Sequence, residues 1–162
     1  MNTKIAVGVL AGALLMSGLL VGASYGGAES ITEPTVLEFK MNTGAEGSEV
    51  RSFRLREYDG TCCGQITEKD MPLFDLDGNV VGRQHISCTV SDSTEWFCRF
   101  VTKIKDGPNT DKGTVVAIGV KGPHGIHHLA IVGGTGAYEN AGGHAIEVER
   151  GSRAAFTLHL IP

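Results

Sequence analysis

The strongest constraint on the fold of this 162-residue chain is a series of short apolar segments with the two-residue period of β-strands. Eight such segments follow Thr35, and glycine, proline, aspartate and asparagine residues separate them. The predicted strands are 36–41, 71–75, 82–91, 95–105, 113–121, 127–132, 144–149 and 153–160. No segment beyond Thr35 has the period of an amphipathic helix of ordinary length. The pattern therefore predicts an all-β domain.

The even strand number and the mostly short connections favour an eight-stranded antiparallel β-barrel over a sandwich. A closed barrel leaves no unpaired strand edges. One long irregular stretch, 42–70, interrupts the pattern. It is expected either to contain an extra strand around 50–56 or to form a long loop that serves as a lid over one barrel mouth.

Alternation along the strands predicts which side chains face the interior. The expected cavity-lining residues are Gln84, Ile86, Cys88, Trp96, Phe100, Val116 and Ile118. A barrel of this size is either filled by its own side chains or holds one small ligand, and the sequence leaves both alternatives open. The opposite faces carry Phe97, Val101, Val115 and Ala117, which predicts a partner, most simply another copy of the chain.

The amino-terminal residues predict export. Lys4 precedes an apolar segment at 5–21, and small residues near 23–28 offer a cleavage site. We expect residues 1–28 to be a signal peptide and 29–162 to be a single secreted domain without a stable membrane anchor. An uncleaved anchor is the alternative. The formal net charge of −4 gives no indication of nucleic-acid binding.

A glycine-rich stretch joins two of the predicted strands at 130–145. Gly133, Gly134 and Gly136 begin it in the manner of a dinucleotide-binding loop. Such a loop requires a following helix, which the sequence AGG at 141–143 and the strand after it argue against. The stretch is therefore interpreted as a turn between strands.

Three motifs in order carry a family resemblance: PLFDLDGNVVG at 72–82, TEWFC at 94–98 and GGTGAYENAGG at 133–143. Together they resemble the allene oxide cyclase and dirigent protein superfamily. The resemblance runs from about residue 36 to 160 and implies a calycin-like barrel, commonly trimeric, with a hydrophobic cavity and no metal or organic cofactor. Plant members of the superfamily shape the cyclisation or coupling of reactive small molecules, and some bacterial relatives cyclise polyketides.

Only some of the functional residues of the superfamily have counterparts in this chain. The resemblance places Glu38 where allene oxide cyclases have a first-strand glutamate, and it places Cys88 at a cavity cysteine. Lys40 and Met71 replace two asparagines that bind water in those enzymes, and Gly142 replaces an arginine of dirigent proteins. These differences argue against either named mechanism. A solvated or ion-paired position on the outer face is the alternative for Glu38.

Four cysteines, Cys62, Cys63, Cys88 and Cys98, allow three connectivities. A three-residue hairpin loop at 92–94 would place Cys88 directly opposite Cys98, so that the two could form a disulfide across neighbouring strands. Cys62 and Cys63 would bond to separate partners, or one would pin the long loop to the barrel. The cysteine spacing is unlike that of a zinc site, and no metal is expected.

The histidines offer candidate acid–base chemistry. If His127 points inward with Leu129 and Ile131, it can meet His144 from the next strand inside the barrel. Exposed positions at strand ends are the alternative for each histidine.

Two functions of different class follow. One is a cofactor-independent isomerase or cyclase that holds a small hydrophobic molecule, with Glu38, His127 and His144 as candidate catalytic residues. The other is a non-catalytic secreted barrel that binds a hydrophobic ligand or another protein.

Overall fold

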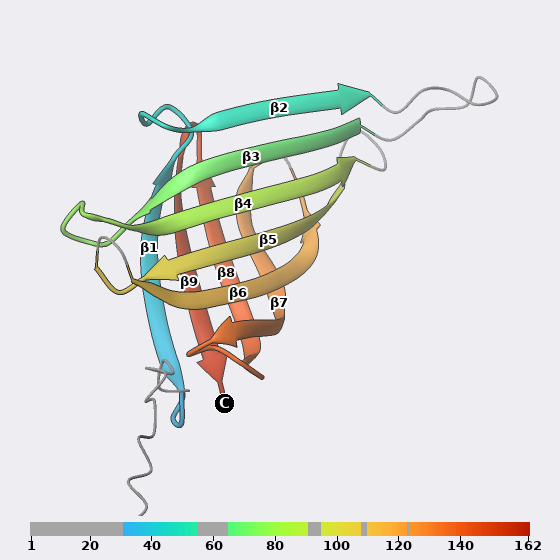
Figure 1. The fold of residues 1–162 in the computed structure, drawn as a ribbon. Coiled ribbons are helices and arrows are strands. Elements are labelled where there is room, and N and C mark those ends of the chain that lie inside the picture. The colour runs from blue at the N-terminus through green and yellow to red at the C-terminus, as the bar shows by residue number, and fades with distance from the viewer. Residues whose placement is uncertain (1–30, 55–64, 91–94, 108–109, 123) are drawn as a thin grey trace, which may run out of the picture.

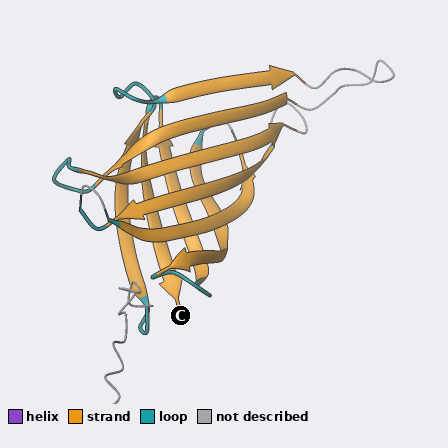
Figure 2. Ribbon diagram, in the orientation of Figure 1, coloured by secondary structure: helices purple, strands orange, loops and turns teal. Residues whose placement is uncertain are grey.

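The structure of the chain is a computed structural model, which describes residues 31–54, 65–90, 95–107, 110–122 and 124–162. These residues form β-strands and loops (Figure 2). The strands are β1 (Thr35–Asn42), β2 (Glu49–Arg54), β3 (Gln65–Phe74), β4 (Val80–Val90), β5 (Trp96–Lys105), β6 (Asp111–Lys121), β7 (Gly125–Gly136), β8 (Gly142–Arg150) and β9 (Arg153–Ile161). Among the described residues there is no helix long and apolar enough to cross a membrane.

Eight of the strands form a closed antiparallel barrel, as the sequence predicts. Each strand from β3 to β9 pairs with its neighbour in sequence, and β1 pairs with β9 (Figure 1). The ring closes where Lys40 and Met41 of β1 pair with Phe74 and Leu73 of β3. The ninth strand, β2, pairs only with the first half of β3 and lies outside the ring. The stretch 42–70 thus contains β2 and the first six residues of β3. The expected signal peptide at 1–28 lies outside the described residues.

The interior faces of β4 and β5 follow the predicted alternation. Gln84, Ile86, Cys88 and Phe100 are buried, and Trp96 is half-buried against the core. Phe100 stacks on Phe156 of β9, with 5.6 Å between ring centroids. The core therefore spans the barrel from one wall to the opposite one.

The predicted interior face of β6 is wrong. Val115 and Ala117 are buried inside, whereas Val116 and Ile118 lie on the outer face and are only partly covered. The register with β5 places Ala117 directly opposite Phe100, whose ring stacks on that of Phe156. Both faces of this strand carry β-branched residues, so composition alone could not identify the inner one.

The glycine-rich stretch ends β7 and enters a tight turn. Strand β7 continues to Gly136, with an irregularity in its pairing to β6 near Gly133. At Gly134 a Cβ would collide with the carbonyl oxygens of Thr114 and Tyr138. Tyr138 itself is buried, and Asn140 has a positive φ of 64°. Glycine at 134 thus lets the backbone of the turn pack against the barrel end.

Candidate functional site

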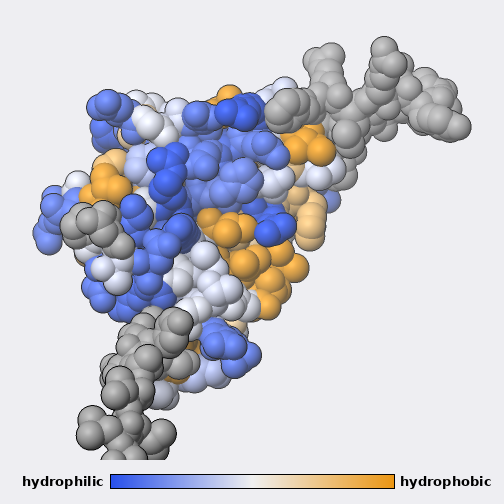
Figure 3. Space-filling model, viewed as in Figure 1, coloured by the Kyte–Doolittle hydropathy of each residue, from blue (hydrophilic) through white to orange (hydrophobic). Residues whose placement is uncertain are grey.

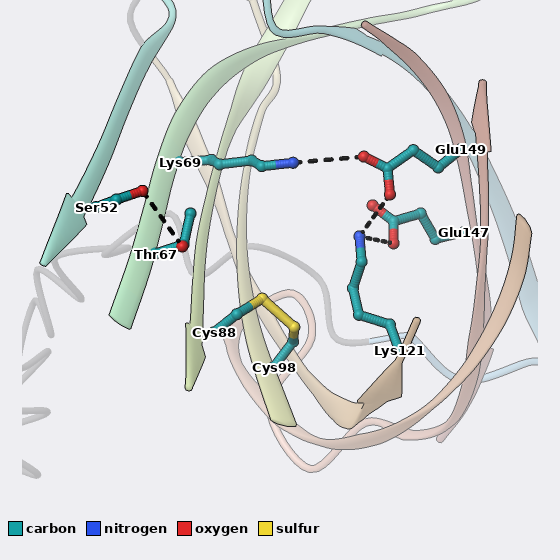
Figure 4. Close-up of a disulfide and its surroundings, with 8 residues drawn as sticks. All are labelled: Ser52, Thr67, Lys69, Cys88, Cys98, Lys121, Glu147 and Glu149. Atoms are coloured by element: carbon teal, nitrogen blue, oxygen red, sulfur yellow. Dashed lines mark hydrogen bonds and ion pairs between the residues drawn. A yellow bond between two sulfur atoms is a disulfide. The ribbon is translucent and has the colours of Figure 1, made fainter. Parts of the chain in front are cut away.

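Ionisable side chains converge inside one end of the barrel. The ammonium of Lys121 on β6 donates to Oε2 of Glu147 at 2.8 Å and to Oε2 of Glu149 at 2.9 Å. Lys69 on β3 reaches Oε1 of Glu149 from the opposite wall, at 3.4 Å. Figure 4 shows the four side chains pointing toward one another across the barrel. We call these residues, together with His127, the interior cluster.

The strand register explains how these charges come together. His127 on β7 lies directly opposite Glu147 on β8, and Glu149 follows two residues later on the same face. The alternation of β8 therefore turns Ala145 and both glutamates inward and leaves Ile146 and Val148 on the outer face. Strand β8 therefore turns its charged side chains, and not its large aliphatic ones, into the barrel.

Burial makes this cluster unusual. The side chains of Lys121 and Glu147 are 1% and 2% exposed, and that of Glu149 is 11% exposed. The Lys121 ammonium also lies 5.9 Å from the centroid of the Phe100 ring, where the ring face can stabilise a cation. The charged cluster thus directly adjoins the aromatic core.

The environment shifts two pKa values. Burial raises the pKa of Glu149, but the hydrogen bond and charge of Lys121, aided by Lys69, outweigh it and hold that pKa below its ordinary value. Burial is the main cause that lowers the pKa of His127, and the charge of Lys121 lowers it further against the opposing effect of the glutamates. His127 is therefore neutral at neutral pH, and its buried Nε2 has no hydrogen-bond partner among the described residues.

Three residues of the interior cluster carry side chains that can bind a metal ion. Ligand atoms of His127, Glu147 and Glu149 lie within 4.8 Å of one another, close enough to surround an ion. The Lys121 ammonium already bonds to both carboxylates, so a divalent cation would have to displace it. The arrangement is better suited to an ammonium group than to a metal.

Side chains fill most of the space beside the cluster. A void of about 10 Å³ adjoins Glu147 and Glu149, and Met41, Met71 and Lys69 are among its walls. A volume of this size accommodates about one water molecule. An organic ligand would have to displace side chains, and methionine and lysine are flexible enough to move.

The structure separates the three predicted catalytic residues. His127 is buried inside, but Glu38 and His144 are exposed on the outer face of the barrel. His144 stacks on His159 there, with ring centroids 4.4 Å apart. The predicted interior pair of His127 and His144 is therefore wrong, because opposite faces of the sheet carry the two side chains.

Sequence reasoning missed four members of the interior cluster: Lys69, Lys121, Glu147 and Glu149. One signal was present, since Glu147 and Glu149 are two residues apart and share one strand face. Charged residues on a strand normally indicate the solvent side, however, so this signal pointed outward.

The predicted disulfide between Cys88 and Cys98 is present. The two residues are directly opposite in the β4–β5 register, with Cα atoms 4.1 Å apart. Figure 4 shows the disulfide on the barrel wall near Lys121. Cys62 and Cys63 lie outside the described residues.

Comparison with protein-family models finds no match, and comparison with curated proteins finds none either. Solved structures with the same fold are similar at low sequence identity. A pyocyanin demethylase matches with a TM-score of 0.59 and 18% identity over 78% of this chain and 100% of that one. The pterocarpan synthase dirigent protein GePTS1 matches with a TM-score of 0.59 and 19% identity over 81% and 87%. A heme-binding cyclase of neoabyssomicin biosynthesis matches with a TM-score of 0.54 and 15% identity over 80% and 69%. The chain thus has the barrel fold that the dirigent protein shares with the heme-binding cyclase, as the sequence resemblance implies.

Proposed function

We propose that this barrel binds a small, mostly apolar molecule against the interior cluster and acts on it as a cofactor-independent isomerase or cyclase. The observation that carries the proposal is the burial of Lys121, Glu147 and Glu149 beside the aromatic core. Fold likeness supports it to a lesser degree, because structural neighbours named as cyclases and dirigent proteins act on small molecules within the same architecture.

Stability alone is a poor reason to bury these charges. Removing an ion from water costs several kcal/mol even after the protein relaxes, and well-packed apolar residues often stabilise a fold as much as a buried ion pair does. Buried ionisable groups with shifted pKa values are characteristic of functional sites. The interior cluster fits that description, since His127 and Glu149 have shifted pKa values at one end of an apolar interior.

Two groups of the interior cluster can act chemically on a bound molecule. Neutral His127, with its unpartnered Nε2, can take a proton from a bound molecule or return one to it. The Lys121 ammonium can stabilise negative charge that develops on an oxygen of the ligand. The apolar walls would hold the molecule in one folded shape, which supplies much of the selectivity.

Non-catalytic binding is the second candidate. The interior void of about 10 Å³ gives no preformed site for a reaction, and exposed Phe97 and Val120 on the outer face offer apolar surface to another protein. Under this alternative the barrel binds a hydrophobic ligand or another protein without chemical change.

Metabolites bound to the protein provide the test. The protein is purified from its native host, and organic extracts of wild type, His127→Gln and the control His128→Gln are compared by chromatography coupled to mass spectrometry, because isomers share one mass. His128 is the adjacent histidine and lies exposed on the outer face. We expect His127→Gln to be recovered with the unconverted molecule, and wild type and His128→Gln to be recovered with its isomerised product. Recovery of the same metabolite with all three proteins would support binding without catalysis, and recovery of none would contradict small-molecule binding of either kind and leave protein binding.

We further propose that the domain is secreted and self-associates. The Cys88–Cys98 disulfide supports secretion, because such bonds persist in oxidising compartments. Exposed Phe97 and Val120 pair across β5 and β6 on the outer face, and hydrophobic surface gathers over this side of the barrel (Figure 3). Light scattering should show an oligomer such as a trimer. A monomer at micromolar concentration would refute self-association.

A further inference from the structure

A second hollow lies on the outside of the barrel. It has a volume of about 580 Å³ and runs over the outer faces of β1, β8 and β9, beside the β3–β4 hairpin. Lys40 pairs with both Ala155 and Phe74, and Ala155 pairs with Val148, so these four side chains share the outer face. The volume is within the usual range for small-molecule sites. We call this hollow the outer groove.

The outer groove is distinct from the interior cluster. Along their strands, Lys40 and Ala155 alternate with Met41 and Ala154, which turn toward the inside. The sheet therefore lies between the two sites, and Met41, Arg153 and Ala154 border both the groove and the small void beside the interior cluster. A ligand in the groove would contact Val148 and Ala155 without reaching Glu147.

The charged residues that line the groove are all basic. Lys40, Arg150 and Arg153 line it, and none of the lining residues carries a carboxylate. The Lys40 ammonium donates to the carbonyl of Leu76 at 2.6 Å, which holds it beside the hairpin. Arg150 and Arg153 make no ion pair within the described part of the chain. Three cations around one groove stand out in a chain whose formal net charge is −4.

We propose that the outer groove binds an organic carboxylate with an apolar body. Phe74, Val148 and Ala155 offer apolar surface to the body, and aromatic rings of a ligand can pack against Phe74. The guanidinium groups of Arg150 and Arg153 match the two oxygens of a carboxylate. An inorganic anion would leave the apolar floor unused, and a neutral hydrophobic molecule would leave the cations unpaired.

The test compares an anionic and a neutral probe. Naphthoate and naphthylmethanol share the same apolar body, and their binding is measured by calorimetry and by transfer of NMR signal to protein methyl groups. We expect naphthoate to bind at least about tenfold more tightly, with contacts to the methyl groups of Val148 and Ala155. Added salt should weaken its binding, because the arginines are exposed.

Variants locate the site. Arg150→Gln/Arg153→Gln should weaken naphthoate binding about tenfold or more, and Ala155→Trp should abolish it by filling the groove. Arg99→Gln removes an exposed cation of β5 outside the groove and should leave binding unchanged. Equal affinity for the two probes, absence of naphthoate binding, or contacts to the interior residues Ile86 and Leu158 would each overturn the proposal. None of these measurements tests the interior cluster. The proposal for the outer groove can therefore be refuted while the proposed function stands.

Discussion

Replacement of Lys121 by methionine should destabilise the barrel strongly at neutral pH. The lysine side chain is 1% exposed, and its ammonium bonds to Glu147 and Glu149 at 2.8 and 2.9 Å. Methionine keeps much of the packing but leaves two buried carboxylates without their shared cation. Removing one partner of a buried ion pair costs about 3–5 kcal/mol, which is a large part of the stability of an ordinary domain.

The same change should alter how stability depends on pH. In the wild type, Lys121 and Lys69 hold the pKa of Glu149 below its ordinary value. The ionised carboxylate therefore contributes to the free energy of unfolding above the ordinary pKa, and this contribution is lost as the pH falls through the lower, folded-state pKa. In Lys121→Met, burial would dominate and raise the pKa of Glu149. The penalty of the substitution should therefore be greatest at neutral pH and shrink as the pH falls toward about 4 to 5.

Urea denaturation at several pH values measures both effects. Lys103→Met is the matched control, because Lys103 forms an ion pair with Asp111 in which the two side chains are 49% and 56% exposed. Exposed pairs of this kind contribute about 0–1 kcal/mol. If Lys121→Met were as mildly destabilising as Lys103→Met, or if its penalty did not depend on pH, the reasoning about the interior cluster would be refuted.

Three further predictions concern stability and are all measured by denaturant unfolding. Cys88→Ala/Cys98→Ala should lower the free energy of unfolding by about 3 kcal/mol, because the disulfide links residues 10 apart, and an unchanged value would show that the bond does not constrain the unfolded chain. Gly134→Ala should cost more than about 2 kcal/mol because its Cβ would collide with backbone oxygens, whereas Gly142→Ala, with nothing within 4 Å, should change stability by less than about 0.5 kcal/mol. Equal costs at the two glycines would contradict the packing of the turn. Because the folded-state pKa of His127 is lowered, the wild type should lose stability as the pH falls below about 6.5, and His127→Gln should remove part of that loss; an identical pH profile would show that His127 is not buried in its neutral form.

The sequence was most informative where local rules determine structure. Strand period and turn residues predicted the barrel, and the register expected for β4 and β5 correctly placed Cys88 opposite Cys98. It was least informative where both faces of a strand carry apolar residues. On β6, Val115 and Val116 are chemically equivalent, and only packing against the core of the barrel selects Val115 as the inner one.

The interior cluster could not be predicted from the sequence, because it forms through contacts that no local pattern specifies. Lys121 and Glu147 are 26 positions apart and meet only because β7 lies between their strands and the sheet curves into a barrel. A lone charged residue on a strand is usually exposed, so the sequence argued against an interior location for each of them. His127 was assigned to the interior by its alternation with Leu129 and Ile131, but its partner depended on the inner face of β8, and that face carries Glu147 instead of His144.

Proton transfer inside the barrel is tested most directly with the metabolite that is recovered with the protein. The unconverted molecule from His127→Gln is incubated in deuterated water with wild type, His127→Gln or His128→Gln, chromatography follows its conversion, and mass spectrometry follows its uptake of deuterium. The account predicts a deuterium-labelled product with wild type and His128→Gln, and a rate about a hundredfold lower with His127→Gln, which should still bind the molecule. Equal rates with all three proteins, or a metabolite that stays unchanged and unlabelled, would contradict the assignment of His127 as the proton-transferring residue.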